Sequence, residues 1–324
     1  MIRYPAMLSW LYAITALFAA QATSAAQYPD RPVRVIVSVA PGGGTDIVAR
    51  QIANKLGQLW NQPVVVENRP GAGGNIGAVA VARAKPDGYT LLLTFGSNVM
   101  LNPRLYKDAG FSPQDFVPVI ELASAPFLIS VNQKVPVETF PQLVSFLKQR
   151  KDAFYFCGSQ PGSLDHLAGE LLNSSLGTDM TFVPYKGTAP ALQAVVGGFV
   201  QMAISSIPAS LPFAKERTIR PLAVTSSKRS AMMPDVPTVA ETIPGYEILN
   251  WYGIWAPAGT PAEVVEAVYA TSKQALDAPE VKAFLESNGF NTVGSRPAEF
   301  AGFVREETAK YTALLDKAGV KQLD

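Results

Sequence analysis

The feature that most constrains the fold is a pattern that recurs along the chain: a short apolar strand, a loop of glycine or serine, and a helix. Its clearest copy spans residues 35–46, where a β-branched strand meets three glycines and a helix start. At least two more copies lie between residues 150 and 210. Strands and helices that alternate in this way predict an α/β fold with mixed, mostly parallel sheets.

The loop at residues 41–46 points several backbone N–H groups and the positive end of a helix dipole at one spot. A small anion is the ligand that suits such a spot. The loop contains no lysine, so it is not the phosphate-binding loop of nucleotide hydrolases. Whether it serves a reaction or a binding pocket depends on the rest of the chain.

The N-terminus has the pattern of an export signal. Residues 7–20 form an uncharged, mostly apolar run that follows Arg3 and is short for a membrane span. We expect a secretory signal peptide at residues 1–26, with cleavage after Ala26 or alternatively after Ala22. A retained anchor helix is the competing interpretation.

Charge and cysteine content narrow the class further. Cleavage takes away Arg3, one of 27 Lys and Arg, and none of the 26 Asp and Glu, so the mature chain is close to neutral. A neutral chain of this kind offers no basic face for nucleic acid or anionic lipid. Cys157 is the only cysteine, which excludes an internal disulfide and predicts an N-terminus without a lipid anchor. We expect a protein of about two domains in the bacterial periplasm.

The residue types available argue against most enzymes. His166 is the only histidine, which excludes metal sites built from several histidines. A serine hydrolase would use Ser159 or Ser163 with His166, yet no G-x-S-x-G motif is present. His166 itself fits local hydrogen bonding, ligand contact or catalysis. The glycines within residues 71–77 do not keep the dinucleotide-binding spacing, so we assign them a packing role.

A binding interpretation uses more of these residues. Residues 41–46, 158–163 and 185–188 each lie at a predicted strand-to-helix turn, the end of an open α/β sheet where ligands bind. Two helix N-termini from different domains could hold one or two carboxylates through N–H groups and hydroxyls. Lys186 either adds a positive charge or is a solvated loop lysine. Asp46 either caps N–H groups at the helix start or meets a ligand ammonium.

An ordered set of motifs extends over essentially the whole mature chain. It comprises residues 28–32 (YPDRP), 41–46 (PGGGTD), 67–74 (ENRPGAGG), 86–91 (PDGYTL), 166–171 (HLAGEL), 184–187 (PYKG), 235–241 (DVPTVAE), 251–253 (WYG) and 256–261 (APAGTP). In these motifs the chain resembles the Bug family, the periplasmic solute receptors of tripartite tricarboxylate transporters.

The resemblance implies a two-lobed, hinge-closing fold of the Venus flytrap kind, similar to type II, with a cleft for a small carboxylate. Lobe 1 would comprise residues 27–123 and 250–324, and lobe 2 residues 124–249, with crossovers near residues 117–127 and 246–256. We expect the ligand to be bound by Ser38, Gly42, Gly43, Gly44, Thr45, Asp46, Ser97, Asn98, Ser159, Gly162, Ser163, His166, Tyr185, Lys186, Gly187 and Ser205.

The chain departs from the family pattern at three positions. After Val200 the family usually has two acidic residues, where this chain has Gln201 and Ser205. Their loss removes a possible anchor for a ligand amine and favours a plain carboxylate. Val39 stands where an aromatic residue is common, which changes the width of the pocket.

The sequence therefore predicts a receptor that captures a small organic carboxylate by lobe closure and delivers it to the membrane permease subunits of a tripartite transporter. We expect a monomer with no catalytic residue, no cofactor, no metal and no nucleic-acid partner. An exported serine hydrolase, or a receptor that feeds a sensor protein, is the alternative.

Overall fold

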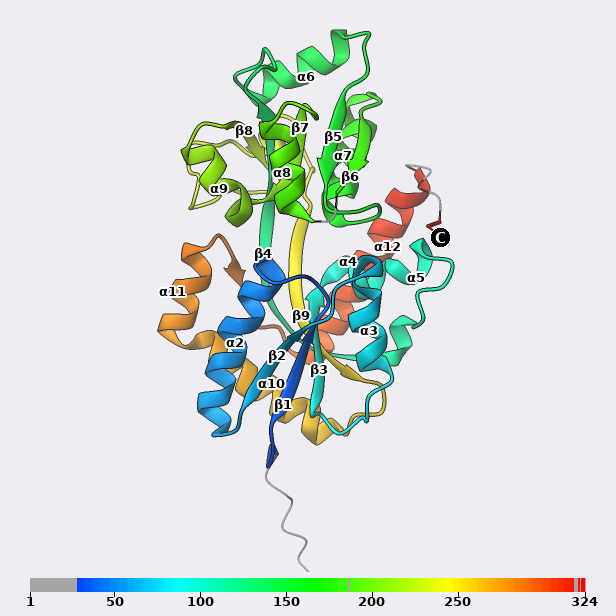
Figure 1. Cartoon of the computed structure of the whole chain (residues 1–324), viewed down its shortest axis with the longest axis vertical. Coiled ribbons are helices and arrows are strands. Elements are labelled where there is room, and N and C mark those ends of the chain that lie inside the picture. Colours follow the sequence, from blue (N-terminus) through cyan, green and yellow to red (C-terminus); the bar gives the residue numbers. More distant parts are fainter. Residues whose placement is uncertain (1–27, 186, 318–319, 321, 324) are drawn as a thin grey trace, which may run out of the picture.

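Two α/β lobes lie one above the other and are joined by two long strands (Figure 1). The computed structural model describes residues 28–185, 187–317, 320, 322 and 323, so the expected signal peptide and Lys186 lie outside the described residues. The prediction of a two-lobed, mixed α/β fold is confirmed.

The first lobe, at the bottom of Figure 1, is built on three parallel strands in the order β2-β1-β3. These strands are β1 (Val33–Val37), β2 (Val64–Asn68) and β3 (Thr90–Phe95). Apolar residues at helical spacing on α2 (Gly44–Trp60), such as Val48, Ile52 and Leu56, are buried in the same hydrophobic cluster as β1. The other elements of the lobe are α3 (Asn75–Ala82), α4 (Gly96–Met100), α5 (Asn102–Leu105), α10 (Ala262–Asp277), α11 (Pro279–Ser287), α12 (Pro297–Lys317) and the short strand β10 (Asn291–Thr292).

The second lobe repeats this plan with the parallel strands β7-β5-β6. These are β5 (Tyr155–Gly158), β6 (Thr181–Pro184) and β7 (Met202–Ser206), and the lobe also contains β8 (Ile219–Val224). The helices are α6 (Phe140–Gln149), α7 (Leu164–Leu176), α8 (Thr188–Val196) and α9 (Ile207–Lys215). Short 3-10 turns at Ala72–Gly74, Pro113–Asp115 and Val239–Glu241 complete the described elements.

The two joining strands are β4 (Phe116–Asn132) and β9 (Leu249–Pro257), which pair antiparallel. β4 pairs with β9 as far as Pro126 and then, from Phe127, with β7 and β8 of the second lobe. Proline lacks a backbone N–H, and Pro126 lies where β4 changes partner. Both strands coincide with the expected crossovers, while the lobe boundaries at residues 123/124 and 249/250 stay a prediction.

One detail of the expected sheets was wrong. The sheets are less parallel than expected, because β4, a single continuous strand, pairs antiparallel with β7, β8, β9 and β10, and β9 pairs antiparallel with β3. Parallel pairing is confined to β2-β1-β3 and β7-β5-β6.

Side-chain alternation along β9 separates two hydrophobic clusters. Trp251 and Trp255 pack against Phe300 of α12, with ring centroids 5.6 and 5.2 Å from its ring. Tyr252 belongs to the other cluster, where its ring meets Phe290 edge-on at 5.5 Å. Because the two faces of β9 are both buried, this strand fixes where α12 and the β1-β3 layer lie relative to each other.

Glu121 is an acid buried in β4, with only 6% of its surface exposed. Burial, and secondarily the charge of Glu307 on α12, raises the pKa of its carboxyl from 4.5 to about 7. The folded protein thus disfavours the ionised form. Above the unfolded pKa, the folded carboxyl keeps a proton that the unfolded carboxyl has lost. The free energy of unfolding is therefore highest below the unfolded pKa and falls as the pH rises through about 7.

We therefore predict that Glu121→Gln raises the free energy of unfolding over that of the wild type by more at pH 8 than at pH 5. The difference between the two gains should be up to about 3 kcal/mol, since glutamine carries no charge to desolvate. Urea unfolding of both proteins at the two pH values measures this. An equal stability difference at pH 5 and pH 8 would show that Glu121 is not held neutral.

Candidate ligand-binding cleft

The predicted site residues follow the carboxyl ends of parallel strands, which in both lobes meet the space between the lobes (Figure 1). Those in the first lobe follow β1 and β3: Ser38, Gly42, Gly43, Gly44, Thr45, Asp46, Ser97 and Asn98. Those in the second lobe follow or end β5, β6 and β7: Ser159, Gly162, Ser163, His166, Tyr185, Gly187 and Ser205. The fold gathers them on two facing edges, and ligand contact by each stays a prediction.

Asp46 shapes the first loop. Its Oδ2 accepts hydrogen bonds of 2.9 Å from the backbone N–H of Gly42 and from Arg50 Nε, and its Oδ1 accepts one of 2.8 Å from Asn68. Burial alone would raise the pKa of this carboxyl, but the bonds from Arg50, Gly42 and Asn68 outweigh it and lower the pKa. Both oxygens are engaged, which argues against contact with a ligand ammonium, and the backbone N–H that Asp46 accepts belongs to Gly42, just before the helix.

Asp165 does the same for the second loop, and sequence reasoning missed it. Its carboxylate accepts bonds from the backbone N–H groups of Ser159 (2.6 Å) and His166 (3.0 Å) and from the hydroxyls of Ser159 (3.1 Å) and Ser163. Burial raises the pKa of Asp165, although these bonds act in the opposite direction. An acid in the first turn of a helix after a glycine-serine loop, as at Asp46, was the signal that could have revealed it.

His166 is held as a structural residue. Its Nδ1 accepts the backbone N–H of Gly162 at 2.8 Å, and its Nε2 lies 3.5 Å from Glu170. The ring stacks on Phe182 with a centroid distance of 3.9 Å. Local hydrogen bonding is therefore the role of His166 that the geometry supports.

The serine hydrolase alternative has no serine–histidine pair among the described residues. The Ser159 hydroxyl donates to Asp165, and the Ser163 hydroxyl lies within hydrogen-bonding distance of two acceptors, Asp165 and the carbonyl of Gln160, the latter at 2.6 Å. Neither hydroxyl is hydrogen-bonded to His166, whose Nδ1 is occupied by Gly162. The serine–histidine contact that such a hydrolase needs is therefore missing among the described residues.

Behind the first loop lies a buried chain of polar groups. The hydroxyls of Ser38 and Thr94 are hydrogen-bonded to each other, and Thr94 donates to Asn98 Oδ1 at 3.0 Å. Asn98 in turn donates to the carbonyl of Gly73 at 3.2 Å. The predicted packing role of the glycines at 71–77 is confirmed at Gly77, where a Cβ would lie 2.9 Å from Ser38 Cα.

The lobes touch each other beside these loops. The side chain of Gln160, in the second lobe, donates to the carbonyl of Gly73 in the first at 3.3 Å. Gly162 approaches Leu105 of α5 so closely that a Cβ on it would lie 2.0 Å from Leu105 Cδ1. Sequence reasoning did not find this contact, because nothing in the local pattern indicates which residues of the two lobes meet.

The two departures after Val200 lie in different places. The side chain of Gln201 accepts the backbone N–H of Tyr155 at 2.9 Å, so Gln201 lies at the start of β5 and β7, the end away from the cleft. The idea that it replaces a ligand anchor is wrong. Ser205 is buried near the cleft end of β7, where its hydroxyl pairs with that of Ser210 at 2.6 Å.

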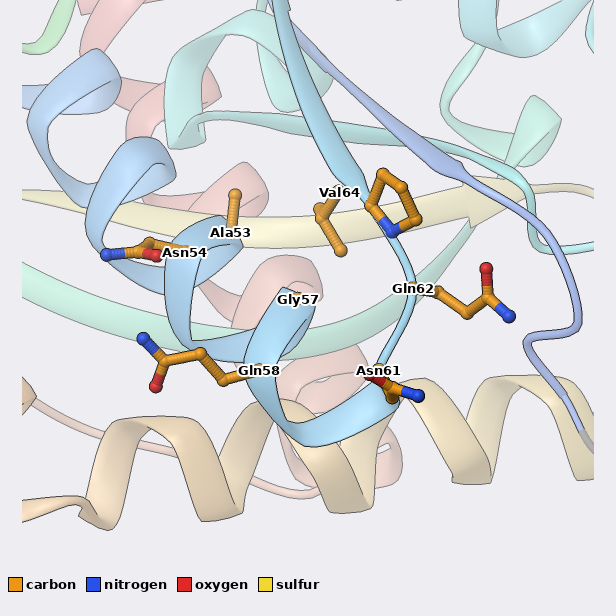
Figure 2. Close-up of a pocket in the computed structure, with 8 residues that line it drawn as sticks. Ala53, Asn54, Gly57, Gln58, Asn61, Gln62 and Val64 are labelled. Carbon is orange, nitrogen blue, oxygen red and sulfur yellow. The ribbon is translucent and has the colours of Figure 1, made fainter.

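A hollow of about 420 Å³ lies at the other end of α2 (Figure 2). It is about 20 Å along the helix axis from the glycine loop, at 1.5 Å per residue. Its amide side chains diverge and leave no converging set of polar groups, unlike a typical ligand pocket. Its lining residues are Ala53, Asn54, Gly57, Gln58, Asn61, Gln62, Pro63 and Val64.

Residues 48–320 match the family model described as the tripartite tricarboxylate transporter family receptor. The chain belongs to this family. Its resemblance to the Bug proteins is also confirmed: protein BugT of Bordetella pertussis is 34% identical over 323 residues, which cover 96% of this chain and 98% of BugT. The family and fold are those of solute-binding proteins.

Solved structures of similar proteins share the whole fold of this family member. A structure described as R. palustris Rpa4515 with adipate is 37% identical, with a TM-score of 0.85 over 91% of this chain and 100% of that one. The periplasmic binding protein BugD is 33% identical with a TM-score of 0.82, over 91% and 100%. MatC from Rhodopseudomonas palustris, with bound malate, is 33% identical with a TM-score of 0.79, over 89% and 100%.

The contact between Gly162 and Leu105 makes a prediction about closure. Gly162→Ala should force the lobes apart and increase the radius of gyration in small-angle X-ray scattering, because the new methyl group meets Leu105. Gly177→Ala is the matched control, since Gly177 ends α7 with a similar positive φ (66° against 76°) but faces open space. The double variant Gly162→Ala/Leu105→Ala should return to the wild-type radius.

Equal radii for Gly162→Ala and Gly177→Ala would contradict this. That result would mean that the lobes do not meet at α5.

Proposed function

We propose that this protein is a periplasmic receptor that binds a small organic carboxylate in the cleft between its lobes and closes on it. The observation that carries the proposal is the pair of facing loops, each folded in advance by an acid from its own helix, Asp46 or Asp165. Each loop leads into a helix of more than three turns, α2 or α7. Helix starts of this kind present N–H groups and a positive dipole end to an anion.

The first loop supplies backbone donors to the ligand. Gly43 is the N-cap residue of α2 and has an extended conformation. It makes no side-chain cap, so no side chain of the N-cap residue covers the free N–H groups of the first turn. Similar proteins have been solved with adipate and with malate, which are dicarboxylates. A dicarboxylate has one anionic group for each lobe.

The ligand is a plain carboxylate and not an amino acid. An ammonium group would need a free acceptor, and the carboxylates of Asp46 and Asp165 each already accept bonds from neighbouring groups of their own lobe. Ser205, where the family usually has an acid, offers only a hydroxyl.

We further infer that the receptor is a monomer that delivers its ligand to the permease subunits of a tripartite transporter. The family description supports this partner. Residues 1–26 would act as the export signal. Within the part of the chain that the structure describes, no helix has the length and apolarity to cross a bilayer.

The role of the first loop can be tested at Gly43, whose φ of −82° suits proline. Gly43→Pro removes one N–H from the helix start and should weaken binding of adipate or malate roughly tenfold or more, the usual cost of a lost hydrogen bond to a charged group. Gly43→Ala is the matched control, because it keeps the N–H and its Cβ would have no neighbour closer than 4.0 Å. Titration calorimetry measures both. If the two variants bind equally well, the N–H of Gly43 is not a ligand donor.

The ligand class can be tested by thermal shift with malate and aspartate, which differ in a hydroxyl and an ammonium group. Malate should stabilise the protein more, because no acceptor awaits the ammonium. A ligand at 100 times its dissociation constant adds about 2.7 kcal/mol of stability, which is readily observed. A larger shift with aspartate would overturn the assignment.

A further inference from the structure

Tyr252 is a buried residue of β9 that the sequence motifs contain but that we did not expect at the site. Its side chain lies on the face of β9 opposite Trp251 and is 1% exposed. Asn250 lies two residues earlier on the same face, where β9 crosses between the lobes. The Asn250 side chain donates a hydrogen bond of 2.9 Å to the Tyr252 hydroxyl.

The hydroxyl lies at the start of α2. A Cβ built on Gly44, the first residue of this helix, would be 2.8 Å from Tyr252 Oη. From the other lobe, the charge of Asp165 acts on the same hydroxyl: burial first, and then Asp165, raises the pKa of Tyr252. The hydroxyl thus lies at the start of α2, and burial favours its protonated form.

The hydrogen-bond pattern leaves that proton without an acceptor. Oη accepts from Asn250, so its own O–H must point elsewhere. Among the described residues, no hydrogen bond donated by this O–H is found. Buried tyrosine hydroxyls usually have a partner for their proton, so a missing one indicates a group that arrives from outside the chain.

We propose that the Tyr252 hydroxyl donates a hydrogen bond to the carboxylate of the ligand bound at the start of α2, and that Asn250 is a positioning residue that orients this hydroxyl. The assignment rests on the proposed function, to which it adds a specific side-chain donor.

A phenol is well suited to this position. It adds a donor to the backbone N–H groups without a fixed charge whose desolvation would oppose binding. With Asn250 on its acceptor side, the hydroxyl faces the ligand as a donor, and so favours a carboxylate oxygen over an ammonium group. The close approach also explains a glycine at position 44, where any side chain would displace the hydroxyl.

The test is titration calorimetry with adipate and malate as probes. Tyr252→Phe keeps the ring against Phe290 and removes only the oxygen, and we expect binding to weaken roughly 10- to 100-fold. Tyr246→Phe is the matched control. Its hydroxyl is also buried but donates to the carbonyl of Ala168 at 2.7 Å, so its loss should leave affinity within about twofold.

Asn250→Ala tests the positioning role in a double-mutant cycle. It should weaken binding in the wild-type background and have no further effect in the Tyr252→Phe background, because it acts through the hydroxyl. If the wild type binds a probe and Tyr252→Phe binds it with the same affinity, the assignment is overturned and the proposed function stays intact. If the wild type binds neither probe nor any member of a wider carboxylate panel, the proposed function fails, and this assignment fails with it.

Discussion

The antiparallel pairing of β4 with β9 is the contact on which the rest of the structure depends. β4 belongs to both lobes, pairing first with β9 and then with β7 and β8, so the register of this one strand sets how the two sheets meet. Alternation along β9 then divides the hydrophobic interior, with Trp251 on the α12 side and Tyr252 on the β1 side. The same alternation brings Asn250 and Tyr252 to the crossing point, beneath the start of α2.

The cleft loops depend on a second constraint, the need to satisfy backbone groups near buried helix starts. Asp46 and Asp165 accept these donors from within their own loops, which holds each loop in shape before any ligand arrives. Loops that are ordered in advance lose little conformational freedom on binding. Both acids already accept these bonds, so neither is free to pair with a ligand ammonium. The dicarboxylates found in similar proteins are consistent with this.

Much of this arrangement could be predicted from the sequence. Strand ends followed by glycine or serine indicated the loops after β1 and β5, and their place at one edge follows from parallel pairing. Contacts between lobes, such as Gln160 with Gly73, could not be predicted, because they depend on how two separately folded surfaces meet. The error at Gln201 was avoidable: it is four residues before Ser205, and at about 3.3 Å per residue the two are too far apart for one ligand group.

The central claim is that a carboxylate lies between the start of α2 and the loop that leads into α7. A crystal structure of the protein with adipate or malate tests it most directly. The account predicts ligand density between residues 42–46 and residues 158–163, with one carboxylate at the helix start of α2. Density in the hollow lined by Asn54, Gln58 and Gln62, with the space between the lobes filled by water alone, would contradict it.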